Sequence, residues 1–216
     1  MIPLRDSTRS QSFPVVTVFL IFMNVYIYIH QVSLGTAGME NIFFSYGLVP
    51  VALLNGENYA SLFSYMFLHG SLMHLIGNMW ILWLFGDNVE DKMGKGQFLL
   101  FYLICGVLAA LSHFVVNPYS YIPVVGASGA VAGVMGAYFL MFKRARILTL
   151  VPPFFLINIP AWIYLGFWAI SQLWCGAQDI FATGTCGQIA FWAHIGGFVV
   201  GMLLYRTFLK KEPIYR

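Results

Sequence analysis

The sequence predicts an all-α integral membrane protein that crosses the bilayer six times and keeps both termini in the cytoplasm. The first observation behind this prediction is composition: of 216 residues, 60% are hydrophobic and only 9% are charged, whereas a soluble domain carries about 25% charged residues. The second is a set of long charge-free stretches, and the third is the distribution of the basic side chains. Too few polar groups are present to cover a solvated surface, which excludes an ordinary soluble fold and a disordered chain.

Charge-free stretches locate the membrane segments, because a charge at the bilayer centre is costly. The chain has five such stretches, which cover residues 10–39, 58–86, 96–142, 147–178 and 180–205. A spanning helix needs about 20 residues, so the third and longest stretch fits two helices. The turn-forming segment Asn117–Pro123, which holds two prolines, separates them. Six helices are therefore predicted, at residues 13–32, 69–87, 96–116, 126–142, 159–176 and 191–209.

The basic side chains predict which way the helices run. With six spans, the N-terminus, loops 2–3 and 4–5, and the C-terminus lie on one side of the membrane. All eleven basic residues fall in these segments: Arg5, Arg9, Lys92, Lys95, Lys143, Arg144, Arg146, Arg206, Lys210, Lys211 and Arg216. Because cytoplasmic loops carry the excess of Lys and Arg, this side is expected to be cytoplasmic. The net charge of +3 is spread thinly, which argues against nucleic acid as a partner.

Four uncharged polar side chains are expected to share one layer near the outer surface. His74 and Asn78 are four residues apart and therefore lie on one face of the second helix. Ser128 and His194 fall in the first turns of the fourth and sixth helices, which also run inward. No Asp or Glu lies deep in a predicted helix, which weakens a transporter or channel interpretation.

Glycines surround these polar residues. Gly126 precedes Ser128, and Gly129 with Gly133 forms a GxxxG pair on the fourth helix. A second pair, Gly197 with Gly201, lies on the sixth helix. Such pairs let two membrane helices approach closely, so contact between these faces would bring Ser128 within hydrogen-bonding reach of His194. The pattern alone leaves open that Ser128 is merely a small interface residue.

The chain resembles the rhomboid intramembrane serine proteases, and the resemblance covers nearly its whole length. The segments His69–Trp80 and Phe85–Asp91 resemble the second helix of that family. Gly126–Ala130 is similar to the family's nucleophile motif, and Ala193–Gly197 to its catalytic-histidine motif. Tyr46–Pro50 is similar to a loop-1 segment common in bacterial members.

This resemblance implies a six-helix bundle that hydrolyses peptide bonds in or beside a substrate's membrane helix. It implies Ser128 as nucleophile, His194 as general base, and His74, Asn78 and the Ser128 backbone N–H as donors to the oxyanion. The expected partners are single-span membrane proteins and the lipid bilayer, and the expected location is a bacterial cytoplasmic membrane. No cofactor or metal is expected, because His69 and His74 are five residues apart and do not share a helix face.

Two points stay open. Some rhomboids place a Tyr one turn after the Ser, stacked on the His, whereas this chain has Ala132 there. Orientation of His194 must come from elsewhere, and Trp192, Trp162 and Trp168 are the candidates. Cys175 and Cys186 flank the loop that covers the site in the family, and the sequence does not decide whether they form a disulfide.

One domain over residues 1–216 is expected. The alternative function is that of a non-catalytic rhomboid-fold protein that binds or chaperones transmembrane clients, against which the intact Ser128 and His194 argue.

Overall fold

The computed structural model describes residues 1–180, 186 and 189–210, so Lys211 and Arg216 lie outside the described residues. Within them, six helices of 14 to 22 residues lie close to the predicted ranges. They are α1 (Val15–Ser33), α5 (Leu72–Met93), α6 (Lys95–Val116), α7 (Ser128–Met141), α8 (Ala161–Ile180) and α9 (Phe191–Phe208). Between α1 and α5 the chain forms α2 (Gly35–Tyr46), α3 (Pro50–Leu54), α4 (Ser61–Ser64) and the 3-10 helix η1 (Tyr65–Phe67).

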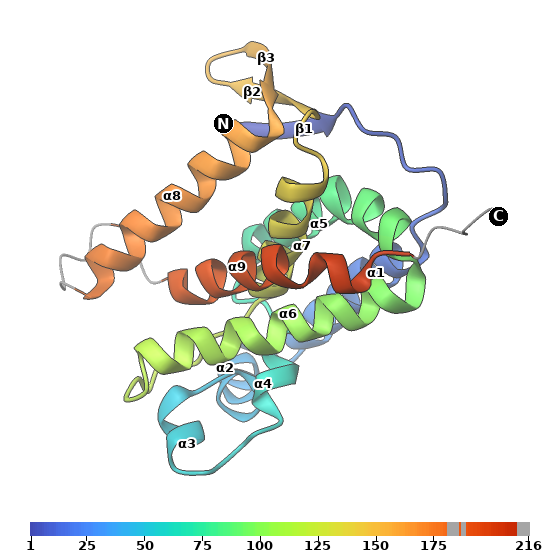
Figure 1. Ribbon diagram of the computed structural model, residues 1–216. Coiled ribbons are helices and arrows are strands. Elements are labelled where there is room, and N and C mark those ends of the chain that lie inside the picture. The colour runs from blue at the N-terminus through green and yellow to red at the C-terminus, as the bar shows by residue number, and fades with distance from the viewer. Residues whose placement is uncertain (181–185, 187–188, 211–216) are drawn as a thin grey trace.

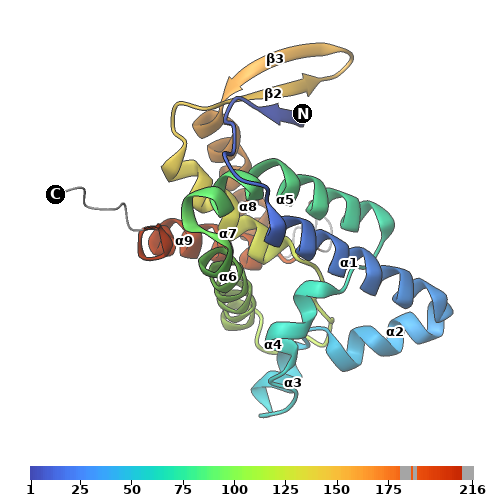
Figure 2. The ribbon, with the colours of Figure 1, turned by 90° about the vertical axis from the view of Figure 1, so that its right-hand side faces the viewer.

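The expectation of a purely helical chain was wrong. An antiparallel sheet of order β1-β2-β3 joins β1 (Ile2–Asp6), β2 (Arg146–Val151) and β3 (Phe155–Pro160). Residues 147–160 belong to the charge-free stretch 147–178, which predicts only a helix that begins at residue 159, yet they are rich in β-branched residues that favour a strand. The sheet and the segment α2–α4 lie at opposite ends of the helices (Figures 1 and 2).

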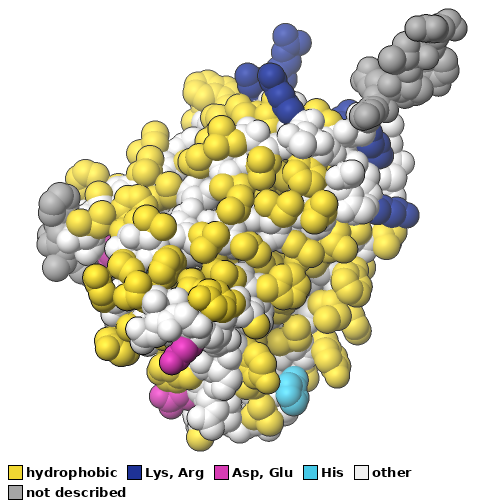
Figure 3. Space-filling model, turned by 60° about the horizontal axis from the view of Figure 1, so that its bottom comes forward, with side chains coloured by type: hydrophobic (Ala, Val, Ile, Leu, Met, Phe, Trp, Pro, Cys, Tyr) yellow, Lys and Arg dark blue, Asp and Glu magenta, His cyan; other side chains and the backbone are white. Residues whose placement is uncertain are grey.

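Among the described residues, two helices, α1 and α6, are long and apolar enough to cross a membrane, judged by length and composition alone, and α7 is apolar but shorter. Many large hydrophobic side chains point outward, such as Phe19 and Phe22 on α1 and Phe167 and Ile170 on α8. The face in Figure 3 is largely covered by hydrophobic side chains. This is the exterior expected of a protein whose solvent is lipid rather than water.

Helix α7 lies at the centre of the bundle. It packs against α5, α6, α8 and α9, and every residue from Gly129 to Tyr138 is buried. Its side chains are mostly Gly, Ala and Val, which let the neighbouring helices approach closely. Ser128 is the first residue of this buried helix, so the packing of α7 positions its backbone.

Buried carboxylates near the sheet fix the start of the chain. Glu90 on α5 accepts hydrogen bonds from the backbone N–H groups of Val16 and Thr17, at 3.0 and 2.8 Å, and caps α1. Asp6 on β1 accepts hydrogen bonds from the Tyr138 hydroxyl and the Asn88 side-chain amide. Burial raises the pKa of the Asp6 carboxyl above its ordinary value, and the hydrogen bond from Tyr138 opposes that effect. Thus β1 is tied to both α5 and α7.

Candidate active site

The turn into α7 brings the side chains of α5 up to Ser128. Gly126, two residues before Ser128, has a φ of +130°, a backbone conformation that side chains rarely allow. A Cβ at Gly126 would lie 2.6 Å from the His74 Cε1 and 3.6 Å from the Asn78 Nδ2. The missing side chain therefore leaves room for both predicted oxyanion donors beside the start of α7.

Backbone contact between α7 and α9 places His194 opposite Ser128. A Cβ on Gly197 would lie 2.0 Å from the Gly129 carbonyl oxygen, and one on Gly201 would lie 2.0 Å from the Gly133 carbonyl oxygen. Both GxxxG pairs thus meet in one interface. His194 lies three residues before Gly197, on the same helix face, and is carried to the N-terminus of α7.

Ser128 and His194 are hydrogen-bonded. The Ser128 Oγ lies 2.7 Å from the His194 Nε2, and both side chains are half-buried. The other imidazole nitrogen, Nδ1, lies 2.8 Å from the Gln172 Oε1 on α8. Both imidazole nitrogens therefore have a protein partner, which fixes the rotation of the ring about its Cβ–Cγ bond.

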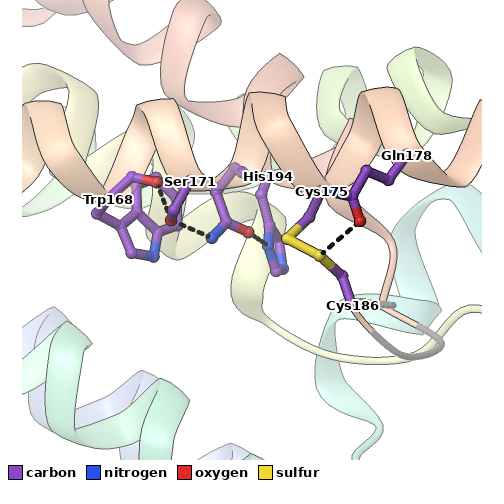
Figure 4. Close-up of a disulfide and its surroundings, with 7 residues drawn as sticks. Trp168, Ser171, Cys175, Gln178, Cys186 and His194 are labelled. Atoms are coloured by element: carbon purple, nitrogen blue, oxygen red, sulfur yellow. Dashed lines mark hydrogen bonds between the residues drawn. A yellow bond between two sulfur atoms is a disulfide. The ribbon is translucent and has the colours of Figure 1, made fainter. Parts of the chain in front are cut away.

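Aromatic rings also surround His194. The Trp168 ring centroid is 6.0 Å from that of His194 with 32° between the planes, and the Phe191 ring meets it edge-on at 6.5 Å. Of the three candidate tryptophans, Trp168 therefore lies beside the imidazole, as Figure 4 shows. Trp162 is exposed, and Trp192 packs against Gly176.

The α5 side of the site is a second hydrogen-bonded cluster. The Asn78 Nδ2 lies 3.0 Å from the His69 Nε2, and the His69 and His74 rings meet edge-on at 5.2 Å. The Gln31 side chain pairs with the backbone of His69, donating at 3.3 Å and accepting at 3.2 Å. Gln31, His69 and Asn78 are all buried. No hydrogen bond between the described residues joins this cluster to Ser128 or His194, and its contact with the start of α7 is the approach of His74 and Asn78 to Gly126.

Sequence reasoning missed Gln31 and Gln172. The signal for Gln172 was present, because Ser171 and Gln172 interrupt an apolar helix at the same outer depth as His194. The helix rotation that turns Gln172 toward His194 was not visible in the sequence.

The disulfide that the sequence left open is present. Cys175 near the end of α8 is bonded to Cys186, with 5.6 Å between their Cα atoms. It lies beside His194 in Figure 4, three residues from Gln172 along α8. The described residues contain no group of three or more His, Cys, Asp or Glu that could hold a metal ion.

Comparison with known proteins connects this geometry to a family. Residues 56–211 match the Rhomboid domain. The chain is 31% identical over 164 residues to the human presenilin-associated rhomboid-like protein, mitochondrial, which covers 69% of this chain and 39% of that protein. It is 32% identical over 149 residues to rhomboid protein 1, mitochondrial, of Saccharomyces cerevisiae, covering 67% of this chain and 40% of that protein.

A bacterial protein is also similar. Rhomboid protease GluP of Bacillus subtilis is 31% identical over 119 residues, which is 55% of this chain and 23% of the relative. The matched regions are thus at most about 40% of the length of these relatives.

Proposed function

The chain belongs to the rhomboid family, and we propose that it is an intramembrane serine endopeptidase with Ser128 as nucleophile and His194 as general base. The match of residues 56–211 to the Rhomboid domain confirms the predicted family. The catalytic activity is what we propose. The observation that carries it is the 2.7 Å hydrogen bond between the Ser128 Oγ and the His194 Nε2. Serine is a poor nucleophile unless an adjacent base takes its proton, and this contact supplies the base.

The proposed reaction is acyl transfer in two steps. The Ser128 Oγ attacks the carbonyl carbon of the scissile peptide bond while its proton passes to the His194 Nε2. The C–N bond then breaks, and the leaving amine takes that proton. Water, deprotonated by the same nitrogen, hydrolyses the Ser128 ester and releases the second product. Among the described residues, the hydrogen-bond partners of the His194 ring are Ser128 and Gln172 and not a carboxylate, which suits a site where a buried charge would be costly.

We propose His74, Asn78 and the Ser128 backbone N–H as donors to the oxyanion of the tetrahedral intermediate. Ser128 is the first residue of α7, where backbone N–H groups lack helical partners. Asn78 uses its Nδ2 toward His69, and the amide group carries a second hydrogen. Each such donor is worth about 10²–10³ in rate.

We propose that all six long helices cross the membrane, with both termini in the cytoplasm and residues 1–216 forming one domain. On the face in Figure 3, basic side chains gather toward one end, and acidic side chains and a histidine lie toward the other. Helix α7 has 14 residues, or about 21 Å at 1.5 Å per residue, which is short of a bilayer core of about 30 Å. Ser128 would then lie below the outer surface, within reach of a substrate's membrane helix.

The proposed substrates are single-span membrane proteins. For the location, we propose a bacterial cytoplasmic membrane, which the loop-1 segment Tyr46–Pro50 supports. The relatives include both a bacterial protein and mitochondrial ones.

A second candidate function is the binding of transmembrane clients without cleavage. It is favoured by the names of the human and yeast relatives, which are a rhomboid-like protein and a rhomboid protein rather than a protease. The hydrogen-bonded Ser128 and His194 favour the protease instead.

Cleavage of a single-span membrane protein in liposomes tests the proposal. We expect wild-type protein to cleave it and Ser128→Ala and His194→Ala to leave it intact, with Ser45→Ala at an exposed position of α2 as a serine control. Equal cleavage by wild type and Ser128→Ala, or none by wild type across several substrates, would contradict the proposal.

A further inference from the structure

A chain of hydrogen bonds runs from His194 into one turn of α8. The His194 Nδ1 lies 2.8 Å from the Gln172 Oε1, and the Gln172 Nε2 lies 3.2 Å from the Ser171 Oγ. The Ser171 hydroxyl in turn lies 2.6 Å from the carbonyl oxygen of Trp168. Figure 4 shows Ser171 and Trp168 beside His194.

The hydrogen bond between Ser171 and Trp168 fixes the orientation of the Gln172 amide. The Trp168 carbonyl oxygen only accepts, so the single hydrogen of the Ser171 hydroxyl points toward it. The Ser171 Oγ is left with lone pairs and must accept from Gln172. The amide atom facing Ser171 is therefore the NH₂ group, and the atom facing His194 is the carbonyl oxygen.

The same reasoning fixes the protonation of His194. An amide oxygen has no hydrogen to donate, so the His194 Nδ1 must carry one to make the 2.8 Å contact. In a neutral imidazole the other nitrogen is then unprotonated. Nε2 thus presents a lone pair to the Ser128 Oγ at 2.7 Å, which is what a general base requires.

We propose that Gln172 is a positioning residue, which holds His194 in the Nδ1-protonated tautomer and in the orientation that activates Ser128. This inference rests on the proposed function. Gln172 does the work that a carboxylate does in soluble Ser-His-Asp sites, but without placing a charge inside the membrane. It also replaces the missing aromatic ring on α7, where Ala132 packs against Gly197.

The position of Gln172 depends on the placement of α8. This helix lies at the edge of the bundle, and only Ala161, Leu165 and Gly176 are buried along it. Trp168 packs on both His194 and Phe198, and the disulfide at Cys175 ties the same end of α8 to Cys186. Gln172 lies between these two attachments.

The tautomer of His194 tests this proposal without any substrate. In ¹⁵N-histidine-labelled protein, with the His194 signals assigned by their loss in His194→Gln, we expect wild type to carry hydrogen on Nδ1 and none on Nε2. Gln172→Leu removes the acceptor and is expected to shift His194 toward the Nε2-protonated form. A wild-type His194 with hydrogen on Nε2, or the same Nδ1 tautomer in Gln172→Leu, would overturn the proposal.

Kinetics give the second measurement. Gln172→Leu is expected to lower kcat about tenfold, the effect of one lost neutral hydrogen bond, with KM unchanged because Gln172 does not contact substrate. Gln172→Glu keeps an oxygen acceptor for the His194 Nδ1 but adds a carboxyl group in the membrane, so its kcat is expected to lie between those of Gln172→Leu and wild type. Gln97→Leu, at an exposed position of α6, is the matched control.

These outcomes separate the two proposals. If wild type cleaves its substrate and Gln172→Leu matches it in kcat, the role of Gln172 fails while the protease stands. If wild type does not cleave, the protease fails, and the tautomer measurement still decides what Gln172 does to His194.

Discussion

Gly126 determines how closely α5 approaches the nucleophile. At its φ of +130° and with the His74 Cε1 2.6 Å from the position of a Cβ, any side chain at Gly126 would push His74 away from the start of α7. The polar residues around this glycine form two clusters, one joining α1, His69 and α5 and one joining α7, α8 and α9. The reaction proposed here needs both clusters, because one supplies the base and the other the oxyanion donors.

Asn78→Ala is expected to lower kcat by about 10²-fold without abolishing cleavage, since the other oxyanion donors remain. The change also removes the contact with His69, so thermal unfolding should be measured beside the initial rates. Asn55→Ala, at an exposed position after α3, is the matched control. An unchanged kcat in Asn78→Ala would remove Asn78 from the oxyanion site.

Some of these residues could be predicted from the sequence and others could not. Ser128, His194, His74 and Asn78 stand out because they are polar within apolar helices and lie in motifs with fixed spacing. Gln172 is equally polar, but its contact with His194 depends on how α8 is rotated, and no spacing within α8 encodes that rotation. Gln31 contacts the backbone of His69. Because every residue type offers these backbone atoms, the sequence does not indicate which residue Gln31 contacts.

Among the elements, α7 and α9 form the contact on which the site depends. Gly201→Ala would place a Cβ 2.0 Å from the Gly133 carbonyl oxygen, so the helices must separate. We expect the free energy of unfolding in detergent to fall by about 1–3 kcal/mol, together with a loss of cleavage as His194 moves from Ser128. Gly77→Ala, where a Cβ meets nothing within 4 Å, should instead raise stability by up to about 1 kcal/mol. Equal stability of the two variants would contradict the close contact.

The disulfide attaches α8 to the segment before α9. Its cysteines are 11 residues apart, and closing a loop of that size is worth about 3 kcal/mol. We expect Cys175→Ser with Cys186→Ser to lower the Tm, and a reductant to lower the Tm of wild type but not of the double variant. Alkylation of Cys175 in unreduced wild-type protein would show that the bond does not form.

The sheet is the element that the sequence did not reveal. Charge-free stretches and turn residues located the ends of the six long helices to within six residues, because both are local properties of the chain. In the sheet, Ile2 at the N-terminus pairs with Leu150 on β2, and Ile147 on β2 pairs with Ile159 on β3. Such pairing is set by tertiary contact, and the charge-free stretch 147–178 concealed it.

The proposed topology of the whole chain places the sheet on the cytoplasmic side of the membrane and the turn between α6 and α7 on the outer side. In a cysteine-free background, Tyr119→Cys at that exposed turn should react with a membrane-impermeant maleimide applied to intact cells. Arg144→Cys, exposed before β2, should react only after the membrane is opened. The reverse pattern would contradict the orientation inferred from the basic residues.

The most direct test of the central claim is covalent labelling of Ser128 by a fluorophosphonate in native membranes, because it requires no knowledge of the substrate. An activated serine attacks the phosphorus, expels fluoride and keeps the phosphonyl group, which peptide mapping locates. We predict a label on Ser128 in wild type that is lost in His194→Ala and reduced in Gln172→Leu. A wild-type protein that takes up no label at Ser128, or takes up the same label without His194, would contradict the account.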